Sequence, residues 1–144
     1  SQFLSLIELH FNTMKTVSEY AELIDLSPKH LRETVKEKLG ESALYFIHKR
    51  VVKEAKYLLV YTNKTIYSIA IALNFQDASQ FTRFFKQKVG LSPKNFYAFV
   101  MISSITSKIM AQPSFISSSE MVNGGVIRIA QPSNSNQNKI SPLS

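Results

Sequence analysis

Residues 31–42 (LRETVKEKLGES) and residues 81–92 (FTRFFKQKVGLS) follow one pattern at an offset of 50 positions. In both stretches an apolar side chain recurs at every fourth residue, as on one face of an α-helix, and a glycine ends the run. The repeat predicts two copies of a unit made of a short helix, a turn and a longer helix, with one extra residue in the second turn. The short helix carries its own repeat, because Val17, Tyr20, Ala21 and Leu26 recur 49 positions later as Ile66, Ile69, Ala70 and Phe75.

Capping residues divide residues 1–101 into seven expected helices. Serine, threonine or aspartate precedes most of them, and Gly40 and Gly90 follow two of them. No segment alternates polar and apolar residues with a period of two, so the sequence predicts an all-α fold. The expected helices lie near 2–14, from Thr16 to Ile24, from Ser27-Pro28 to Gly40, from Ser42 to about Tyr61, from Thr65 through Leu73, from Asp77 to Gly90 and from Ser92-Pro93 onward.

The expected helix from Ser42 to Tyr61 is a long linker between the two units. Its 20 residues would span roughly 30 Å, close to the roughly 34 Å between successive major-groove faces of DNA. Its expected core residues are Phe46, Val52, Ala55 and Leu59. Four tyrosines among apolar residues are expected in the core or at its edge: Tyr45, Tyr57, Tyr61 and Tyr67.

The composition favours a polyanionic partner and excludes several chemistries. The 144 residues carry a formal charge of +7 and the pI is about 9.7, but charge alone does not choose between nucleic acid and an anionic membrane. The absence of cysteine removes disulfides, thiolate zinc sites and cysteine nucleophiles. The longest apolar run, residues 96–102, is too short to span a bilayer, and no signal peptide is expected, which predicts a soluble, cytoplasmic protein. A first residue other than Met suggests a piece of a longer protein.

The sequence divides into regions of different character. We expect a first helix-turn-helix unit at residues 1–41, the linker helix at 42–61 and a second helix-turn-helix unit at 62–101. Residues 102–144, with 11 serines and three prolines, are expected to form a mostly disordered tail. An extension of the last helix through Met101–Met110 remains open.

The outer faces of the third and sixth helices are the candidate functional surface. Small and hydrogen-bonding side chains near the start of an exposed helix suit base edges in the major groove, and arginine suits guanine. These faces carry Lys29, His30, Arg32, Glu33 and Lys36 on the third helix, and Ala78, Ser79, Gln80, Thr82, Arg83 and Lys86 on the sixth. Candidate phosphate contacts are Lys36, Gln80, Lys86 and Lys88. A helical bundle whose repeat reflects only core packing is the plainer alternative.

The same residues resemble a known family, the AraC/XylS-type transcription regulators. The second unit resembles that of the family in Ile69-Ala70, Leu73-Asn74-Phe75, Phe81, Arg83-Phe84-Phe85-Lys86, Gly90 and Ser92-Pro93. The linker helix of the family is matched by Arg50, Ala55 and Leu58-Leu59. Its first unit is matched by Ser27-Pro28 with Leu31. The resemblance covers about residues 3–99 and implies a seven-helix module that binds double-stranded DNA as the output of a bacterial regulator. It also implies RNA polymerase and a missing N-terminal sensory domain as partners. The base-reading positions that it implies are Lys29, His30, Arg32, Glu33, Ala78, Ser79, Thr82 and Arg83.

Two residues depart from the family pattern. Asn74 stands where the family usually has glycine, and since asparagine tolerates a positive φ the turn should form. Glu33 stands at an often polar or basic position, where it could accept a hydrogen bond from a cytosine amino group or repel phosphate.

Other readings of the chain remain as alternatives. The runner-up is a helical protein-interaction module that does not bind DNA, and a third is membrane attachment through Phe96–Ile102. The three histidines are not clustered, and Asp25, Glu41 and Asp77 lie at helix boundaries, where capping explains them better than acid–base catalysis. With no glycine-rich phosphate loop and no nucleophile–base arrangement, we expect no enzyme, no metal, no cofactor and no membrane partner.

Overall fold

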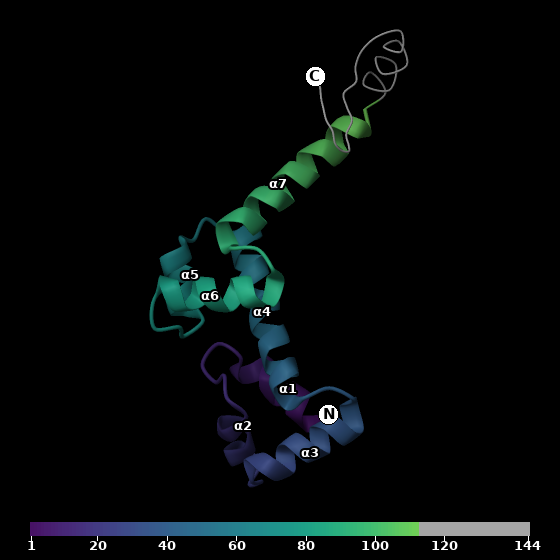
Figure 1. Cartoon of the computed structure of the whole chain (residues 1–144), viewed down its shortest axis with the longest axis vertical. Helices are drawn as coiled ribbons and strands as arrows, with labels where there is room; N and C mark the ends of the chain where they lie inside the picture. The colour runs from purple at the N-terminus through teal and green to yellow at the C-terminus, as the bar shows by residue number, and fades with distance from the viewer. Residues whose placement is uncertain (113–144) are drawn as a thin grey trace. The chain divides into compact units, whose positions relative to one another are not determined.

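The computed structural model describes residues 1–112, and these residues form seven α-helices with no strand among them (Figure 1). The predicted all-α fold is therefore confirmed. The predictions for residues 113–144, including disorder of the distal tail, lie outside the described residues. The helices are α1 (Gln2–His10), α2 (Val17–Leu23), α3 (Pro28–Leu39), α4 (Ala43–Tyr61), α5 (Ile66–Ala72), α6 (Ala78–Val89) and α7 (Pro93–Met110).

Side-chain caps start most helices where the sequence predicts. The side chains of Thr16, Ser27, Ser42, Thr65 and Asp77 each accept a hydrogen bond from the backbone N–H three residues later. These bonds satisfy donors that the first helical turn leaves unpaired. The Thr16 hydroxyl also donates to the Glu19 carboxylate at 2.6 Å, so the two residues of the expected capping box are joined through their side chains as well.

The first helix is shorter than the predicted range of 2–14, because a turn replaces its last residues. α1 ends at His10, and the backbone N–H groups of Thr13 and Met14 both donate to the His10 carbonyl. The Thr13 hydroxyl donates to the same carbonyl at 3.3 Å. A carbonyl that takes three donors closes a turn and does not continue a helix.

Both short helices end in the same turn, at Asp25 after α2 and at Asn74 after α5. These two residues have φ values of 55° and 64°, the positive-φ non-glycine residues of the described chain. In each turn the next N–H donates to the carbonyl five residues earlier, from Leu26 to Ala21 at 3.0 Å and from Phe75 to Ala70 at 2.8 Å. This is the Schellman arrangement, and it explains why those positions recur in the sequence. The expectation that Asn74 tolerates the turn is confirmed.

The helix α4 contributes to two separate hydrophobic cores. Ala43 and Ile47 belong to the core of α1, α2 and α3. Further along, Val51, Ala55, Leu58 and Leu59 belong to the core of α5 and α6. The buried stripe thus follows every fourth residue from Ala43 to Leu59.

Two of the predicted core residues of α4 were wrong by one position. Phe46 and Val52 are only half-buried, whereas their neighbours Ile47 and Val51 are 0% exposed. The error has a physical cause, because a helix that packs at both ends against different partners is apolar over a wide arc. Periodicity alone then leaves the centre of the buried stripe uncertain by one residue.

The four tyrosines predicted for the core or its edge lie instead on the surface. Tyr45, Tyr57, Tyr61 and Tyr67 are 43%, 54%, 74% and 62% exposed. Apolar neighbours in sequence misled the prediction, since those neighbours point to the opposite side of the helix. The fully buried tyrosine is Tyr20, whose hydroxyl donates to the Met14 carbonyl at 3.2 Å.

The chain divides into two compact regions, residues 1–97, which include α1 to α6, and residues 98–144. The helix α7 continues to Met110, so the extension that the sequence left open does form. Over residues 1–112, none of the helices has the length and apolar character that a membrane crossing requires.

Candidate nucleic-acid interface

The helix α3 presents its predicted reading face to solvent. Leu31 and Val35 are buried at 2% and 4% exposure, which orients the rest of the helix outward. All five candidates on this helix are exposed, namely Lys29, His30, Arg32, Glu33 and Lys36. In this structure the Lys36 ammonium donates to the Gly40 carbonyl at 3.1 Å, where it stabilises the C-terminal end of its own helix.

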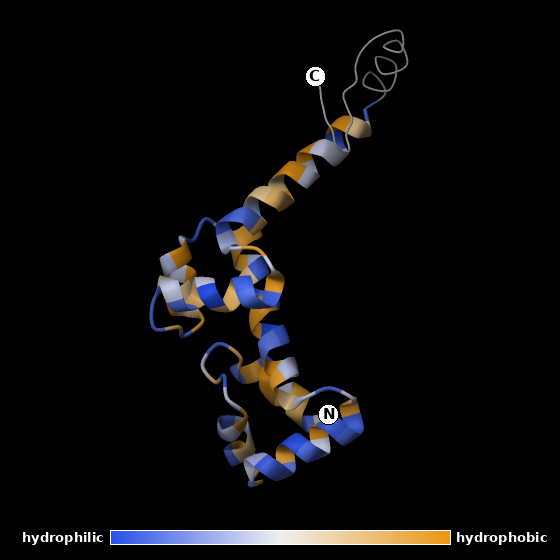
Figure 2. Cartoon of the chain, in the orientation of Figure 1, coloured by the Kyte–Doolittle hydropathy of each residue, from blue (hydrophilic) through white to orange (hydrophobic). Residues whose placement is uncertain are grey.

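The helix α6 is oriented in the same way by Phe81 and Phe85, both 0% exposed. Its candidate residues divide into an exposed group and two half-buried members, Ala78 and Thr82. The exposed group comprises Ser79, Gln80, Arg83, Lys86 and Lys88. In Figure 2 both α3 and α6 carry hydrophilic (blue) and hydrophobic (orange) residues along their length.

Gln80 is engaged in holding the turn before α6. Its side-chain oxygen accepts from the Gln76 backbone N–H at 2.6 Å, and its own N–H donates to the Asp77 carboxylate at 2.8 Å. Asp77 is therefore a cap, as predicted, and Gln80 supports the loop that precedes the reading helix. A phosphate contact by the Gln80 side chain would compete with this bond.

A basic groove of about 570 Å³ runs beside α3, between this helix, the start of α2 and the start of α4. Its lining includes the charged or titratable side chains of Lys15, Arg32, Lys36 and His48 and contains no carboxylate. The remaining lining residues are Thr16, Val17, Ser18, Ser42, Ala43 and Leu44. The sequence candidates included Arg32 and Lys36 but missed the loop and linker-helix residues, since no local pattern indicates that they share a groove.

His48 is a half-buried lining residue of this groove and adds little charge at neutral pH. Burial, and then the nearby Lys88 ammonium, lower the pKa of its imidazole below the ordinary value. Its ring meets Phe84 edge to face, with 5.1 Å between the ring centroids. The positive charge on the open side of the groove therefore comes mainly from α3.

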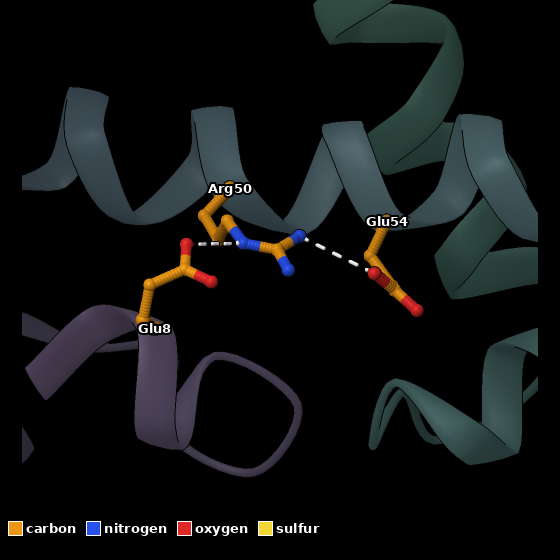
Figure 3. A network of polar contacts seen from close by, with 3 residues as sticks. All are labelled: Glu8, Arg50 and Glu54. Atoms are coloured by element: carbon orange, nitrogen blue, oxygen red, sulfur yellow. Dashed lines mark hydrogen bonds and ion pairs between the residues drawn. The ribbon is translucent and has the colours of Figure 1, made fainter. Parts of the chain in front are cut away.

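An ion-pair network holds α1 against the linker helix (Figure 3). The Arg50 Nε donates to Glu8 at 2.6 Å, and its Nη1 donates to Glu54 at 3.3 Å. The guanidinium also lies over the Phe11 ring, 3.9 Å from its centroid. The bond from Arg50 lowers the pKa of the Glu8 carboxyl below its usual value. Arg50, which the family resemblance singled out, thus supports the first unit and does not face the groove.

Two helix-turn-helix units on one linker helix, each with an exposed polar face on its second helix, define a DNA-binding module. The family model described as a helix-turn-helix domain matches residues 20–98, more than half of the chain. The chain belongs to this family, the AraC-type helix-turn-helix domains, whose function is DNA binding in transcription regulators.

The curated relatives are longer than this chain. An uncharacterized HTH-type transcriptional regulator of Staphylococcus aureus (strain MSSA476) is 34% identical over 96 residues, which are 67% of this chain and 13% of that protein. The Bifunctional transcriptional activator/DNA repair enzyme AdaA of Bacillus subtilis is 33% identical over 90 residues, 62% of this chain and 43% of that protein. The chain therefore spans well under two thirds of the length of these relatives.

Solved structures share the fold. The C-terminal domain of AraT, a response regulator from Geobacillus stearothermophilus, is 27% identical with a TM-score of 0.63, over 68% of this chain and 82% of that one. The C-terminal domain of the response regulator yesN from Fusobacterium nucleatum is 26% identical with a TM-score of 0.62, over 67% of this chain and 94% of that one. The predicted resemblance to AraC/XylS-type regulators is confirmed by these comparisons.

Proposed function

We propose that this chain reads two half-sites on one side of double-stranded DNA, one with α3 and the other with α6, as the output module of a bacterial transcription regulator. One observation supports the proposal above all others: two similarly capped, exposed helices are held by a single helix of 19 residues. That helix is about 28 Å long, close to the roughly 34 Å between successive major-groove faces.

Base reading is assigned to the exposed and half-buried positions near the start of each reading helix. On α6, Arg83 donates to guanine, while Ala78, Ser79 and Thr82 offer small apolar and hydroxyl contacts. On α3, Lys29, His30 and Arg32 supply donors. Glu33 is the acceptor of this set and selects a cytosine amino group.

Phosphate binding is assigned to the lysines of the same two helices and to the basic groove. Lys86 and Lys88 flank the end of α6, and Lys36 has to leave the Gly40 carbonyl to reach a phosphate. Gln80 likewise has to exchange its bond to Gln76. In the groove, Arg32 supplies charge and the start of α4 at Ser42 supplies backbone donors.

The longer protein is proposed to add a sensory domain and to act with RNA polymerase in the cytoplasm. The relatives named as transcription regulators support this, because much of their length lies outside the matched region. We assign no catalytic step, metal or cofactor to the chain itself. Its proposed activity is DNA binding alone.

A protein-interaction role is the second candidate, and the exposed tyrosines favour it. The rings of Tyr57 and Tyr61 contact each other in a tilted arrangement, with centroids 5.4 Å apart, while the two residues remain 54% and 74% exposed. Aromatic side chains with this exposure are common at the centres of protein interfaces. They lie on α4 and not on the reading helices, so a protein partner and DNA can bind at the same time.

The test is selection of bound duplexes from a random library, followed by binding assays at low salt with the selected duplex. Insertion of five base pairs between the half-sites turns one of them to the opposite face, since about ten base pairs make one turn. We expect binding to fall to the level of a single half-site and to recover partly with ten inserted base pairs. Equal binding to all three duplexes would show that one unit alone reads DNA, and no binding to any duplex would favour the protein-interaction role.

A further inference from the structure

The loop after α1 touches the turn of the second helix-turn-helix unit, far along the chain. The Asn74 side-chain amide donates to the Thr13 carbonyl at 3.0 Å. The Lys15 ammonium donates to the Leu73 carbonyl and lies over the Phe75 ring, 5.0 Å from its centroid. These partners are 61 and 58 residues apart in the sequence, so the contacts join the two units directly.

The Lys15 contact lies in a partly dry environment. Lys15 is half-buried, and desolvation lowers the pKa of its ammonium while Glu19 opposes this shift. A cation withdrawn from water depends on the partners that remain to it, here a carbonyl at the C-terminal end of α5 and an aromatic face. The ammonium is therefore committed to the second unit and is not available to the groove.

Asn74 has a role beyond its backbone conformation. Its φ of 64° alone would suit glycine. Asp25 occupies the equivalent position of the first unit with φ 55°, and it is exposed with no side-chain hydrogen bond among residues 1–112. The two positions share the turn, but only Asn74 carries an amide that reaches the other unit.

The linker helix by itself does not fix the angle between α3 and α6. Apart from Phe11, which packs against both cores, each unit packs on its own part of α4, and a long helix bends gently over such a distance. A lateral contact at the level of the two turns removes that freedom, because it closes a ring through α1, α4 and α5.

We propose that Lys15 and Asn74 form a brace between the two units that fixes the angle between α3 and α6. The brace thereby sets the half-site spacing that the protein accepts. The second statement rests on the proposed DNA-reading function, whereas the first does not.

The first experiment measures the angle without DNA. Because the chain has no cysteine, E37C and Q87C introduce one label on α3 and one on α6, both at exposed positions. Distances between spin labels are compared for the parent, N74G, K15M and D25G proteins. N74G keeps the positive-φ turn and removes only the amide, and D25G makes the matching change in the other turn.

We expect a narrow distance distribution for the parent and D25G, and a distribution at least about twofold broader for N74G and K15M. The net value of one hydrogen bond, about two- to tenfold in an equilibrium constant, is enough to populate an open arrangement. An N74G K15M double variant that stays as narrow as the parent, with unchanged circular dichroism, overturns the brace.

The second experiment measures spacing with the duplex selected for the parent protein. Two inserted base pairs rotate one half-site by about 70°. We expect this insertion to weaken the parent and D25G by about tenfold and N74G by less than about threefold, with similar binding of all three to the uninserted duplex. Equal losses for N74G and D25G overturn the role in spacing. If the parent binds no duplex, the proposed function fails while the label distances still decide the brace.

Discussion

The two helix-turn-helix units share their boundaries but not their cores. Both have a capped start, a Schellman turn with a positive-φ residue, and a glycine that ends the longer helix, at φ 85° and 94°. The first core is mostly aliphatic around Tyr20, whereas the second packs the aromatic rings of Phe75, Phe81 and Phe85 at steep angles to one another. The comparison shows that the repeat preserves the turns and the ends of helices, while different side chains fill equivalent interiors.

The reading faces differ in a second way. The first carries four titratable side chains, all exposed, and the second combines one arginine with small and hydroxyl side chains. Small residues allow the backbone of a helix to approach base edges closely, and a carboxylate near phosphate opposes approach. On the proposed assignment of base-reading residues, we expect the second unit to discriminate bases better and Glu33 to restrict where the first unit binds.

The largest expected effect tests the difference between the cores. Phe81→Ala should cost about 3–5 kcal/mol of unfolding free energy, because it removes a fully buried ring that packs against two others. Leu31→Ala, at the equivalent place, should cost about 2–4 kcal/mol. Urea titrations measure the free energy of unfolding of both variants. Hydrogen exchange should show faster opening of α5 and α6 only in Phe81→Ala. Equal opening of both units in either variant would mean that the cores are not separate.

The next prediction concerns the reading faces. Arg83→Ala should cost about 1–3 kcal/mol on the selected duplex and relax preference at one base position. Lys86→Ala, three residues on, should weaken all duplexes alike and reduce the salt slope by about one. Binding to selected and random duplexes over a salt series separates the two. The assignment of Arg83 to a base is contradicted if both duplexes lose the same affinity.

A smaller effect is expected from the ion-pair network of the first unit. Arg50→Ala should lower the free energy of unfolding by about 1–2 kcal/mol, since it removes packing on Phe11 and the partner of the half-buried Glu54. Lys49→Ala, an exposed change on the same helix and outside this network, is the control. Thermal unfolding is the measurement. Equal stabilities of the two variants would show that the ion-pair network does not stabilise the first unit.

The smallest effect depends on pH. Burial raises the pKa of Tyr20 to about 12, so the folded state holds this proton more tightly than an unfolded tyrosine, whose pKa is 10.0. The resulting stabilisation is complete below pH 10 and is lost as pH rises toward 12. Tyr20→Phe should lose about 1 kcal/mol at neutral pH, from the bond to Met14, and should lose less than the parent between pH 10 and 12. Parallel alkaline profiles for the two proteins would contradict this.

Local signals in the sequence predicted the local structure well. The caps at Ser27, Ser42 and Asp77 and the turn at Asn74 depend on residues within five positions of each other, which a sequence shows directly. The centre of the stripe on α4 and the exposure of its tyrosines depend on which partner packs where, and periodicity does not contain that information.

In the candidate site, too, the sequence predicted the local features and missed the contacts between distant segments. The orientation of α3 and α6 follows from their apolar spacing, so the exposure of Arg32 and Arg83 was predictable. The groove and the contact of Asn74 with Thr13 join segments far apart in the sequence. Such contacts arise only when the whole chain has folded.

The shared helix α4 has a consequence for anyone who divides the gene. A fragment that stops after α4 leaves Val51, Ala55, Leu58 and Leu59 without the side chains that cover them, and a fragment that begins at α5 lacks the same surface. Either half presents an apolar patch to water and is prone to self-association. The pair of units is thus the smallest portion that can be moved into another regulator, and fusion points belong before α1 or beyond the second unit.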